Sequence, residues 1–447
     1  MHHLPTLVTV VVAATAIASA AFAQFIARDP GPRGGVAGAG GKIAGLTASQ
    51  VEYFNAGQAA FAESDTVGSG LGPRFNLDSC GGCHAQPAIG GTSPAINPQV
   101  SVATAFGARN VPPSFVRADG PVREARFKYK ADGARDGGVH ALYVISGRVD
   151  NTGSATGCTI VQEDFETQVV KKNVSRRIPT PLFGGGLIEQ IPDSAILTNQ
   201  ALNAAAKTAL GIAGRPNRNG NDGTIGRFGW KAQNKSLLIF SGEAYNVEQG
   251  ITNELFPTER DETWSCQFHS YPNDTTATDA AGVDVLSDIE KFTFFARFLA
   301  PPLNSETTPG GSDSVGRGRY FFKTIGCAHC HAPQLHSGYS TVLALREQPV
   351  KLFSDLLLHR MGPGLADDIV QGDAAGDEFR TAPLWGLGQR LFFLHDGRTK
   401  DLVDAILAHQ SPASSQYRAS EANAVIDAYR ALQESQKQDV LNFLRSL

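Results

Sequence analysis

Two short motifs in the chain place thiols and an imidazole at a spacing that suits one kind of chemistry. They read Cys80-Gly-Gly-Cys83-His84 and Cys327-Ala-His-Cys330-His331. Two thiols three positions apart can each form a thioether bond to a vinyl group of one haem, and the histidine that follows can then bind the iron. One copy could be a redox dithiol that happens to precede a histidine. Two copies in one chain predict two covalently attached haem c groups, with His84 and His331 as proximal iron ligands.

The start of the chain is typical of an exported protein. Residues 7–21 form an uncharged apolar run, and Ala21-Phe22-Ala23 has the small-x-small pattern of a cleavage site. Because the run is short for a membrane span and a glycine-rich stretch follows, we expect a signal peptide over residues 1–23 rather than an uncleaved anchor. Covalent haem attachment needs export and reduced thiols, so the sequence predicts a periplasmic protein with no membrane span after cleavage.

The composition is that of a globular protein large enough for two or three domains. The chain has 447 residues, of which 42% are hydrophobic and 18% charged, and its formal net charge is -4. It has no basic excess that would indicate nucleic acid as a partner. Four of the six cysteines belong to the two motifs. The remaining two, Cys158 and Cys266, are expected to form a structural disulfide, and two buried free thiols are the alternative.

The elements that must position the first motif are helical, with a β-containing insertion. Residues 24–45 are rich in glycine and are expected to form a flexible leader. Thr47 and Gln50 then have the spacing of a capping box and predict the start of a helix. Runs of β-forming residues predict strands inside an insertion at about 121–190.

Helical patterns return in the rest of the chain. They cover residues 194–210 and 287–299, and a polar linker at 304–314 follows. The linker separates an N-terminal haem domain at 46–303, which contains the insertion, from a C-terminal cytochrome c domain at 315–447. The predicted fold is therefore mainly α, with two cytochrome c-like haem domains.

The C-terminal domain has the expected start and end of a cytochrome c unit. A short helix leads into Cys327, and Ser435 and Gln438 have the spacing of a capping box for the last helix. Val440 and Leu444 lie on the apolar face of that helix.

Three longer stretches resemble a known family. They read Gly70-Leu-Gly-Pro-Arg-Phe-Asn-Leu-Asp-Ser-Cys-Gly-Gly-Cys-His, Phe228-Gly-Trp-Lys-Ala-Gln and Glu378-Phe-Arg-Thr-Ala-Pro-Leu-Trp-Gly-Leu-Gly. Such stretches resemble the bacterial di-haem oxidoreductases of peroxidase type, and the resemblance covers nearly the whole mature chain. More distantly, Phe379 to His409 is similar to the C-terminal domain of dihaem cytochrome c peroxidases and MauG-type enzymes. The resemblance implies that electrons enter at the C-terminal haem and that peroxide is reduced at the N-terminal haem.

The sixth ligand of each iron separates electron transfer from catalysis, because only an open iron can bind peroxide. In the dihaem peroxidases an axial methionine stands fourteen residues after the histidine of a Phe-x-His-Asp-Gly stretch, which is His395 here. His409 occupies that position, so the resemblance implies bis-histidine ligation of the C-terminal haem and a lower potential than in a His/Met site. Met361 is the alternative ligand, although a lone methionine is more often part of a core.

No such ligand is found for the N-terminal haem, where the resemblance implies a distal Glu or Gln. Cleavage of an O–O bond needs an acid–base group and a positive charge for the leaving hydroxide. Both kinds of group stand close together in Arg123, Glu124 and Arg126. Glu243 and Glu248 are alternatives, and a solvated cluster of ion pairs is the non-catalytic interpretation.

The sequence also offers tryptophans for haem contact and electron transfer. Trp385 is close in sequence to the predicted C-terminal haem pocket and is the expected contact, with Trp230 and Trp264 as alternatives. The related peroxidases bind calcium through a Thr-x-Pro stretch. Arg390 and Phe392 occupy those positions here, so calcium is doubtful as a further cofactor.

The leading interpretation is a periplasmic dihaem peroxidase that receives electrons from a small redox protein of the cytochrome c or cupredoxin type. Three other functions are compatible with parts of the sequence: a MauG-like oxidation of a partner protein, an electron carrier with two six-coordinate irons, and a dithiol oxidoreductase. The last is disfavoured by the histidine after each cysteine pair and by the absence of a βαβ pattern.

Overall fold

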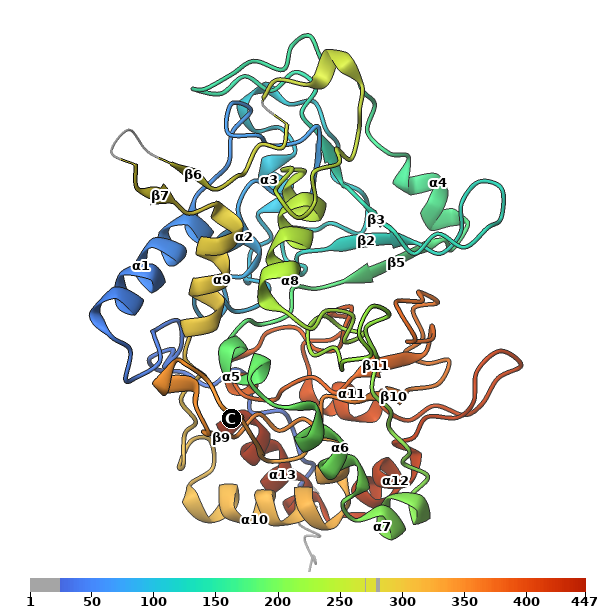
Figure 1. The fold of residues 1–447 in the computed structure, drawn as a ribbon. Helices are drawn as coiled ribbons and strands as arrows, with labels where there is room; N and C mark the ends of the chain where they lie inside the picture. The colour runs from blue at the N-terminus through green and yellow to red at the C-terminus, as the bar shows by residue number, and fades with distance from the viewer. Residues whose placement is uncertain (1–24, 270, 279–281) are drawn as a thin grey trace, which may run out of the picture.

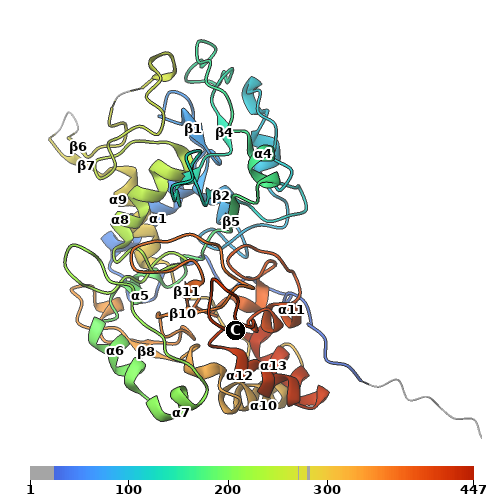
Figure 2. The ribbon, with the colours of Figure 1, turned by 90° about the vertical axis from the view of Figure 1, so that its right-hand side faces the viewer.

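The computed structural model of the chain describes residues 25–269, 271–278 and 282–447. The described residues form two lobes, one above the other in Figure 1, and the side view in Figure 2 shows the same division. The predicted signal peptide at 1–23 lies outside the described residues. No helix in the described part of the chain is long and apolar enough to cross a membrane.

Helices make up most of the regular structure, which confirms the prediction of a mainly α protein with a smaller β-containing part. The α-helices are α1 Ala48–Ala62, α2 Cys80–Cys83, α3 Gln99–Val102, α4 Phe165–Val170, α5 Gly185–Glu189, α6 Asp193–Ala201, α7 Ala204–Ala209, α8 Leu237–Ala244, α9 Asp288–Phe298, α10 Ser312–Thr324, α11 Leu402–Leu407, α12 Asn423–Ala431 and α13 Glu434–Ser446. The strands are β1 Arg74–Phe75, β2 Glu124–Phe127, β3 Val139–His140, β4 Tyr143–Val144, β5 Val174–Arg177, β6 Ala277–Thr278, β7 Asp284–Val285, β8 Leu335–His336, β9 Pro349–Val350, β10 Leu358–Arg360 and β11 Glu378–Arg380.

The largest sheet has three antiparallel strands in the order β3-β2-β5 and lies in the upper lobe. Glu124 of β2 pairs with Arg177 of β5, so these two side chains are on the same face. Arg126 is two residues beyond Glu124 and is on that face as well. Ala125 is on the opposite face, in the apolar core of the upper lobe. The register of this small sheet therefore gathers three charged side chains on one side.

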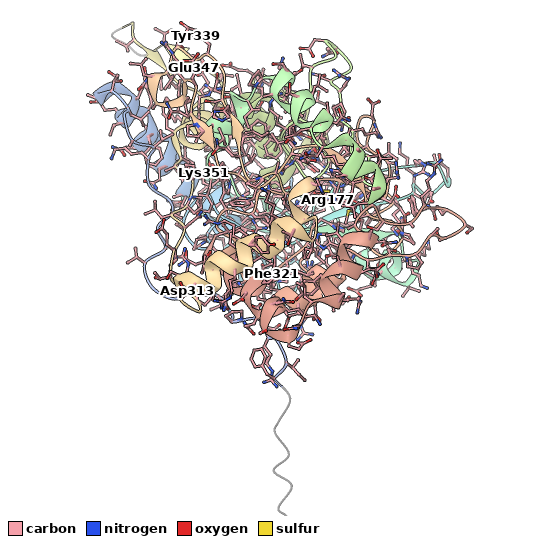
Figure 3. The ribbon with its side chains drawn as sticks, turned by 90° about the horizontal axis from the view of Figure 1, so that it is seen from below. Arg177, Asp313, Phe321, Tyr339, Glu347 and Lys351 are labelled. Atoms are coloured by element: carbon pink, nitrogen blue, oxygen red, sulfur yellow. A yellow bond between two sulfur atoms is a disulfide. The ribbon has the colours of Figure 1, made fainter. Side chains whose placement is uncertain are left out.

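Each lobe contains a pair of crossed helices, α1 with α9 above and α10 with α13 below. The first helix of each pair has a glycine where the second helix comes closest. A side chain at Gly57 would collide with the backbone of Lys291, and one at Gly318 with the backbone of Asp439. A Cys-x-x-Cys motif follows the first helix in both lobes. From below, α10 runs across the underside of the protein, as Figure 3 shows.

Replacement of Gly318 by alanine should lower the free energy of unfolding by about 1–3 kcal/mol, because the added methyl group overpacks the α10–α13 crossing. Gly316→Ala is the matched control on the same helix, since nothing lies within 4 Å of a Cβ there. Its expected effect is a gain of about 0.5–1 kcal/mol from helix propensity. Urea unfolding of the two variants measures both values, and equal effects would mean that the close crossing is not a constraint.

The predicted helices and caps are found with some shifts. The capping box of Thr47 and Gln50 at the start of α1 is confirmed. The box of the last helix is formed by Gln433 and Gln436, two residues before the predicted pair Ser435 and Gln438. The reason is that the chain becomes helical earlier, at Glu434, so the side chains that reach the first free N–H groups are also earlier.

Two segments, the helices α5 to α7 and residues 25–45, do not lie where the predicted domain boundaries would place them. α6 and α7 lie in the lower lobe, and α5 lies where the two lobes meet, against α8 and α9, although all three precede the predicted linker at 304–314. Residues 25–45, expected to be a flexible leader, make specific contacts with the lower lobe. Asp29 forms an ion pair with Arg445 of α13 at 2.6 Å, and the N–H of Arg33 donates to the carbonyl of Gly388 at 2.6 Å.

Cys158 and Cys266 form a disulfide, with their Cα atoms 4.6 Å apart, as predicted. Both cysteines belong to the apolar core of the upper lobe, which also contains the inward-facing residues of β1, β2 and β4. The bond joins two chain segments that are 108 residues apart in the sequence.

Candidate functional site

Each Cys-x-x-Cys-His motif lines a cavity of its own. The upper cavity has a volume of about 160 Å³ and is lined by Cys80, Cys83 and His84, together with side chains of α8, α9 and the β3-β2-β5 sheet. The lower cavity has a volume of about 220 Å³ and is lined by its own motif and by residues of α11, α12 and α13. The four motif cysteines are free thiols. Both cavities thus offer two thiols and one imidazole to the same bound group.

The two motif histidines are held in the same way. The Nδ1 of His84 donates to the carbonyl of Gly91 at 2.9 Å, and the Nδ1 of His331 donates to the carbonyl of Phe353 at 3.1 Å. A carbonyl oxygen can only accept, so the proton is on Nδ1 and the lone pair is on Nε2. Burial lowers the pKa of each imidazole to about 4, which keeps both rings neutral and able to bind a metal.

His409 presents a second such imidazole to the lower cavity. Its Nδ1 donates to the carbonyl of Ala405 at 2.8 Å, which again leaves Nε2 free. Burial is the largest cause that lowers the pKa of His331, and the charge of a protonated His409 is the second. The two rings are therefore near each other. Met361 lines the same cavity. The structure therefore brings both candidate sixth ligands into the lower cavity.

The other histidines of the lower cavity are engaged elsewhere. His359 is held by Asp355 at 2.9 Å and by Glu421 at 2.8 Å, one carboxylate on each ring nitrogen. It has no free nitrogen for a metal. His395 is stacked on Phe379 at 4.3 Å between ring centroids, and burial lowers its pKa to about 4. The next residue, Asp396, forms an ion pair with Arg398 at 2.8 Å.

An acid and a base lie together in the upper cavity. Glu124 forms an ion pair with Arg126 at 2.5 Å, and Glu248 accepts a hydrogen bond from the amide of Asn76 at 2.7 Å. Burial, followed by the negative charge of Glu124, raises the pKa of Glu248 to about 8. Burial acts in the same direction on Glu124, but Arg126 and Arg177 outweigh it and lower the pKa of that carboxyl. At neutral pH the pair is a carboxylic acid hydrogen-bonded to a carboxylate.

Glu248 belongs to a π-helical turn, η2 Tyr245–Gln249, that continues α8. Such turns widen a helix and are frequent at functional sites. Arg123 lines the upper cavity too; it donates to the carbonyl of Asp396, while its Nε has no partner among the described residues. Glu243 is a further lining residue. The structure thus places all five residues nominated from the sequence in one cavity.

The tryptophan between the cavities is Trp230. It lines both cavities, and its indole N–H donates to the carbonyl of Ile178 at 2.9 Å. The predicted contact, Trp385, lines neither of them. Its ring is buried against Gly184 at the start of α5, so its position in the sequence is a poor guide to its direction. Trp264 is 89% exposed.

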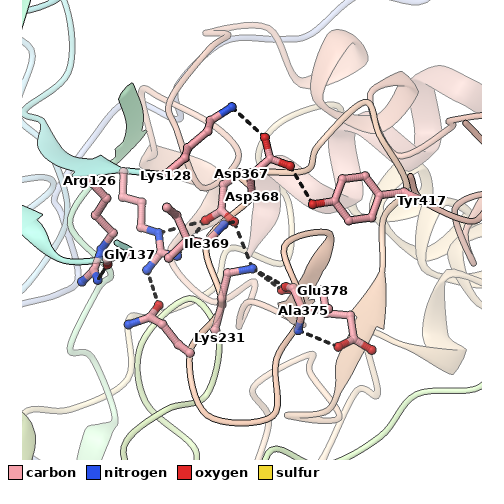
Figure 4. Close-up of polar contacts among 12 residues, drawn as sticks. Arg126, Lys128, Gly137, Lys231, Asp367, Asp368, Ile369, Ala375, Glu378 and Tyr417 are labelled. Atoms are coloured by element: carbon pink, nitrogen blue, oxygen red, sulfur yellow. Dashed lines mark hydrogen bonds and ion pairs between the residues drawn. The ribbon is translucent and has the colours of Figure 1, made fainter. Parts of the chain in front are cut away.

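A buried polar cluster connects the wall of the upper cavity with the lower lobe. Arg177, which lines the upper cavity, forms an ion pair with Asp367 of the lower lobe at 2.7 Å. Lys231 contacts the other oxygen of Asp367 at 3.1 Å and lies over the ring of Phe379, 4.1 Å from its centroid. Figure 4 shows the ion pair between Lys231 and Asp367. Arg177 and Lys231 could not be assigned to the site from the sequence, because charged residues far apart in the chain give no local sign that they meet.

The donor sets fit haem. Each cavity is lined by two thiols that form no disulfide and by a neutral imidazole whose lone pair is on Nε2, which are the groups that a covalently attached haem needs. His84 would hold the iron in the upper cavity, and His331, with His409 or Met361, the iron in the lower one. No group of three or more His, Cys, Asp or Glu side chains in the described ranges is arranged to hold a bare metal ion.

Comparisons with known proteins give a family match over most of the chain and more distant matches to solved structures, two of which are described below. A family model described as "Di-haem oxidoreductase, putative peroxidase" matches residues 125–447. A hydrazine synthase of Kuenenia stuttgartiensis is 18% identical with a TM-score of 0.24; the match covers 37% of this chain and 57% of that chain. A MauG-like protein associated with microbial copper homeostasis is 16% identical with a TM-score of 0.29; it covers 60% of this chain and 89% of that chain.

No curated protein matches the chain. The two solved structures are too distant to carry an argument about function, and the chain spans only 57% of the hydrazine synthase chain. The family model is different, because it covers most of this chain, including one of the two Cys-x-x-Cys-His motifs and both sides of the lower cavity. The chain therefore belongs to the di-haem oxidoreductase family.

Proposed function

We propose that the protein is a periplasmic dihaem peroxidase with one haem c in each cavity. Peroxide would be reduced in the upper cavity, and electrons would enter at the lower haem from a small redox protein of the cytochrome c or cupredoxin type. The observation that carries the proposal is the difference between the cavities. The upper one contains the Glu124–Glu248 acid–base pair, whereas the lower one is lined by a second imidazole, that of His409, in addition to His331.

The upper cavity has the groups that reduction of peroxide to two water molecules requires. A haem held by Cys80 and Cys83 would supply the iron that binds peroxide and the electrons that cleave its O–O bond. The carboxylate of Glu124 is the base that takes the first proton from peroxide, and Glu248 holds a proton that can be passed to the leaving oxygen. The positive charge of Arg126 stabilises the hydroxide that develops there.

Trp230 is the proposed route for electrons between the lobes. Its indole lies between the cavities, and His395 and Phe379 continue from it along the wall of the lower cavity. The centroids of Trp230 and His395 are 6.3 Å apart, and those of His395 and Phe379 are 4.3 Å apart. This aromatic series supports an assignment in which the two haems work as a pair.

The proposal is tested by mass spectrometry and a peroxide titration of the purified full chain. The mass should exceed the polypeptide mass by two haem groups, and a Cys80→Ser/Cys83→Ser variant should lose one of them. Peroxide added to the reduced protein should oxidise it, as followed by electron paramagnetic resonance. A protein without bound haem would refute the proposal. A protein with two low-spin haems that never reacts with peroxide would be an electron carrier.

A further inference from the structure

Two arginines in the wall of the lower cavity differ from the other buried arginines of the protein. Arg380 of β11 and Arg390 are each 7% exposed. Both line the cavity that contains Cys327 and His331. The other buried arginines in the described ranges each have a carboxylate partner. These pairs are Arg126–Glu124, Arg148–Asp78, Arg177–Asp367, Arg227–Asp193 and Arg445–Asp29.

Arg380 and Arg390 have no carboxylate partner in the part of the chain that the structure describes. Arg380 donates only to backbone carbonyls, from Nε to Gly229 at 2.9 Å and from Nη1 to Thr381 at 3.3 Å. The pKa of its guanidinium is lowered to about 10 by burial and by the charge of Arg390. Burial lowers the pKa of Arg390 to about 10 as well, and the neighbouring charge of Arg445 acts in the same direction.

Two unpaired cations side by side in an apolar cavity are unfavourable for the protein alone. Among the described residues no carboxylate pairs with either guanidinium group, so a compensating negative charge has to come from what fills the cavity. An anionic group with two carboxylates would pair with both guanidinium groups, and each pair could be bidentate.

We propose that Arg380 and Arg390 bind the two propionate carboxylates of the haem attached at Cys327 and Cys330, and that their charge raises the reduction potential of this haem. The inference rests on the proposed function, because it requires a haem in the lower cavity. Reduction of the iron removes one positive charge from the site, so fixed positive charges nearby favour the reduced form. The arginines therefore oppose the lowering of the potential by a second imidazole, and they keep the lower haem able to accept an electron.

The test is a spectroelectrochemical titration of the holoprotein and of the variants Arg390→Gln and Arg380→Gln. At a fixed applied potential, each variant should show a reduced-to-oxidised ratio for the lower haem that is about tenfold smaller, which corresponds to ~59 mV for a one-electron couple. Arg390→Lys should retain most of the wild-type ratio, because it keeps the charge. Arg317→Gln is the matched control. It removes an exposed arginine of α10 that is paired with Asp439 of α13.

The outcomes separate this inference from the proposed function. A haem at Cys327 whose potential is unchanged in both glutamine variants would overturn the inference and leave the peroxidase proposal intact. A protein without haem at Cys327 would overturn the proposed function itself. Inorganic phosphate added to the wild type should leave the potential unchanged. A potential that depends on phosphate would mean that the arginines bind a free anion rather than the haem carboxylates, and would overturn the assignment.

Discussion

Replacement of Glu124 by glutamine is expected to lower peroxide turnover by about 10²–10⁴-fold, the usual size of a general acid–base contribution. The glutamine keeps the shape of the side chain but cannot accept the proton of peroxide. The measurement is kcat with a fixed concentration of an artificial electron donor. Glu163→Gln is the control, since Glu163 contacts His140 at the sheet and does not line the upper cavity. A variant at Glu124 with wild-type turnover would place the catalytic base elsewhere.

The Glu124–Glu248 pair predicts that peroxide turnover depends on pH through the ionisation of Glu248. Its pKa is raised to about 8 by burial and by Glu124, so the proton needed by the leaving oxygen is present at neutral pH. Turnover should fall as the pH rises through about 8, and Glu248→Gln should remove this alkaline limb of the pH–activity profile along with most of the activity.

The raised pKa also makes stability depend on pH, because the folded protein binds the proton of Glu248 more tightly than the unfolded chain does. The stability that it contributes is complete below the unfolded pKa of 4.5 and is lost as the pH rises through 8.

The second large effect is expected at the lower iron. His409→Gly should remove the sixth ligand, so the lower haem loses its low-spin optical and electron paramagnetic resonance signals. Met361→Leu should leave these signals unchanged, because the methionine then only packs against the core around Trp230 and Phe379. His409→Met should raise the potential, because a thioether donates less strongly than an imidazole.

The reverse result, with loss of the low-spin signals in the Met361 variant alone, would make Met361 the ligand and refute the bis-histidine assignment. A spectrum unaffected by either change would mean that the lower iron has no sixth ligand from these two residues. Measurement of the Arg390→Gln potential in the same preparations separates ligand effects from charge effects.

The features that could be predicted from the sequence depend on residues close together in the chain. The capping box of Thr47 and Gln50, the Cys-x-x-Cys-His motifs and the helix expected at 287–299, found as α9 at Asp288–Phe298, are of this kind. Their signals are complete within a few residues, because a cap is formed within the first turn and the apolar face of a helix repeats within two turns.

The remaining parts of the site depend on contacts between distant segments. Glu124 and Arg177 meet because β2 and β5 pair, and Glu248 reaches them from the end of α8. No pattern in the sequence indicates that β2 and β5 pair with each other. For the same reason the predicted contact of Trp385 with the lower cavity is wrong, and Trp230 lines the cavities instead. Distance along the chain does not determine which way a ring points from its helix or loop.

The crossing of first and last helices in each lobe has a consequence for the order of events during assembly. The thiols of each motif come after α1 or α10 in the chain, but the helices that pack against these, α9 and α13, are made much later. Until those helices are in place, the chain around each thiol pair is open, because contacts between distant segments form slowly. In the proposed dihaem protein, covalent attachment would therefore precede closure, and the attached ring would become the surface on which the rest of each lobe packs.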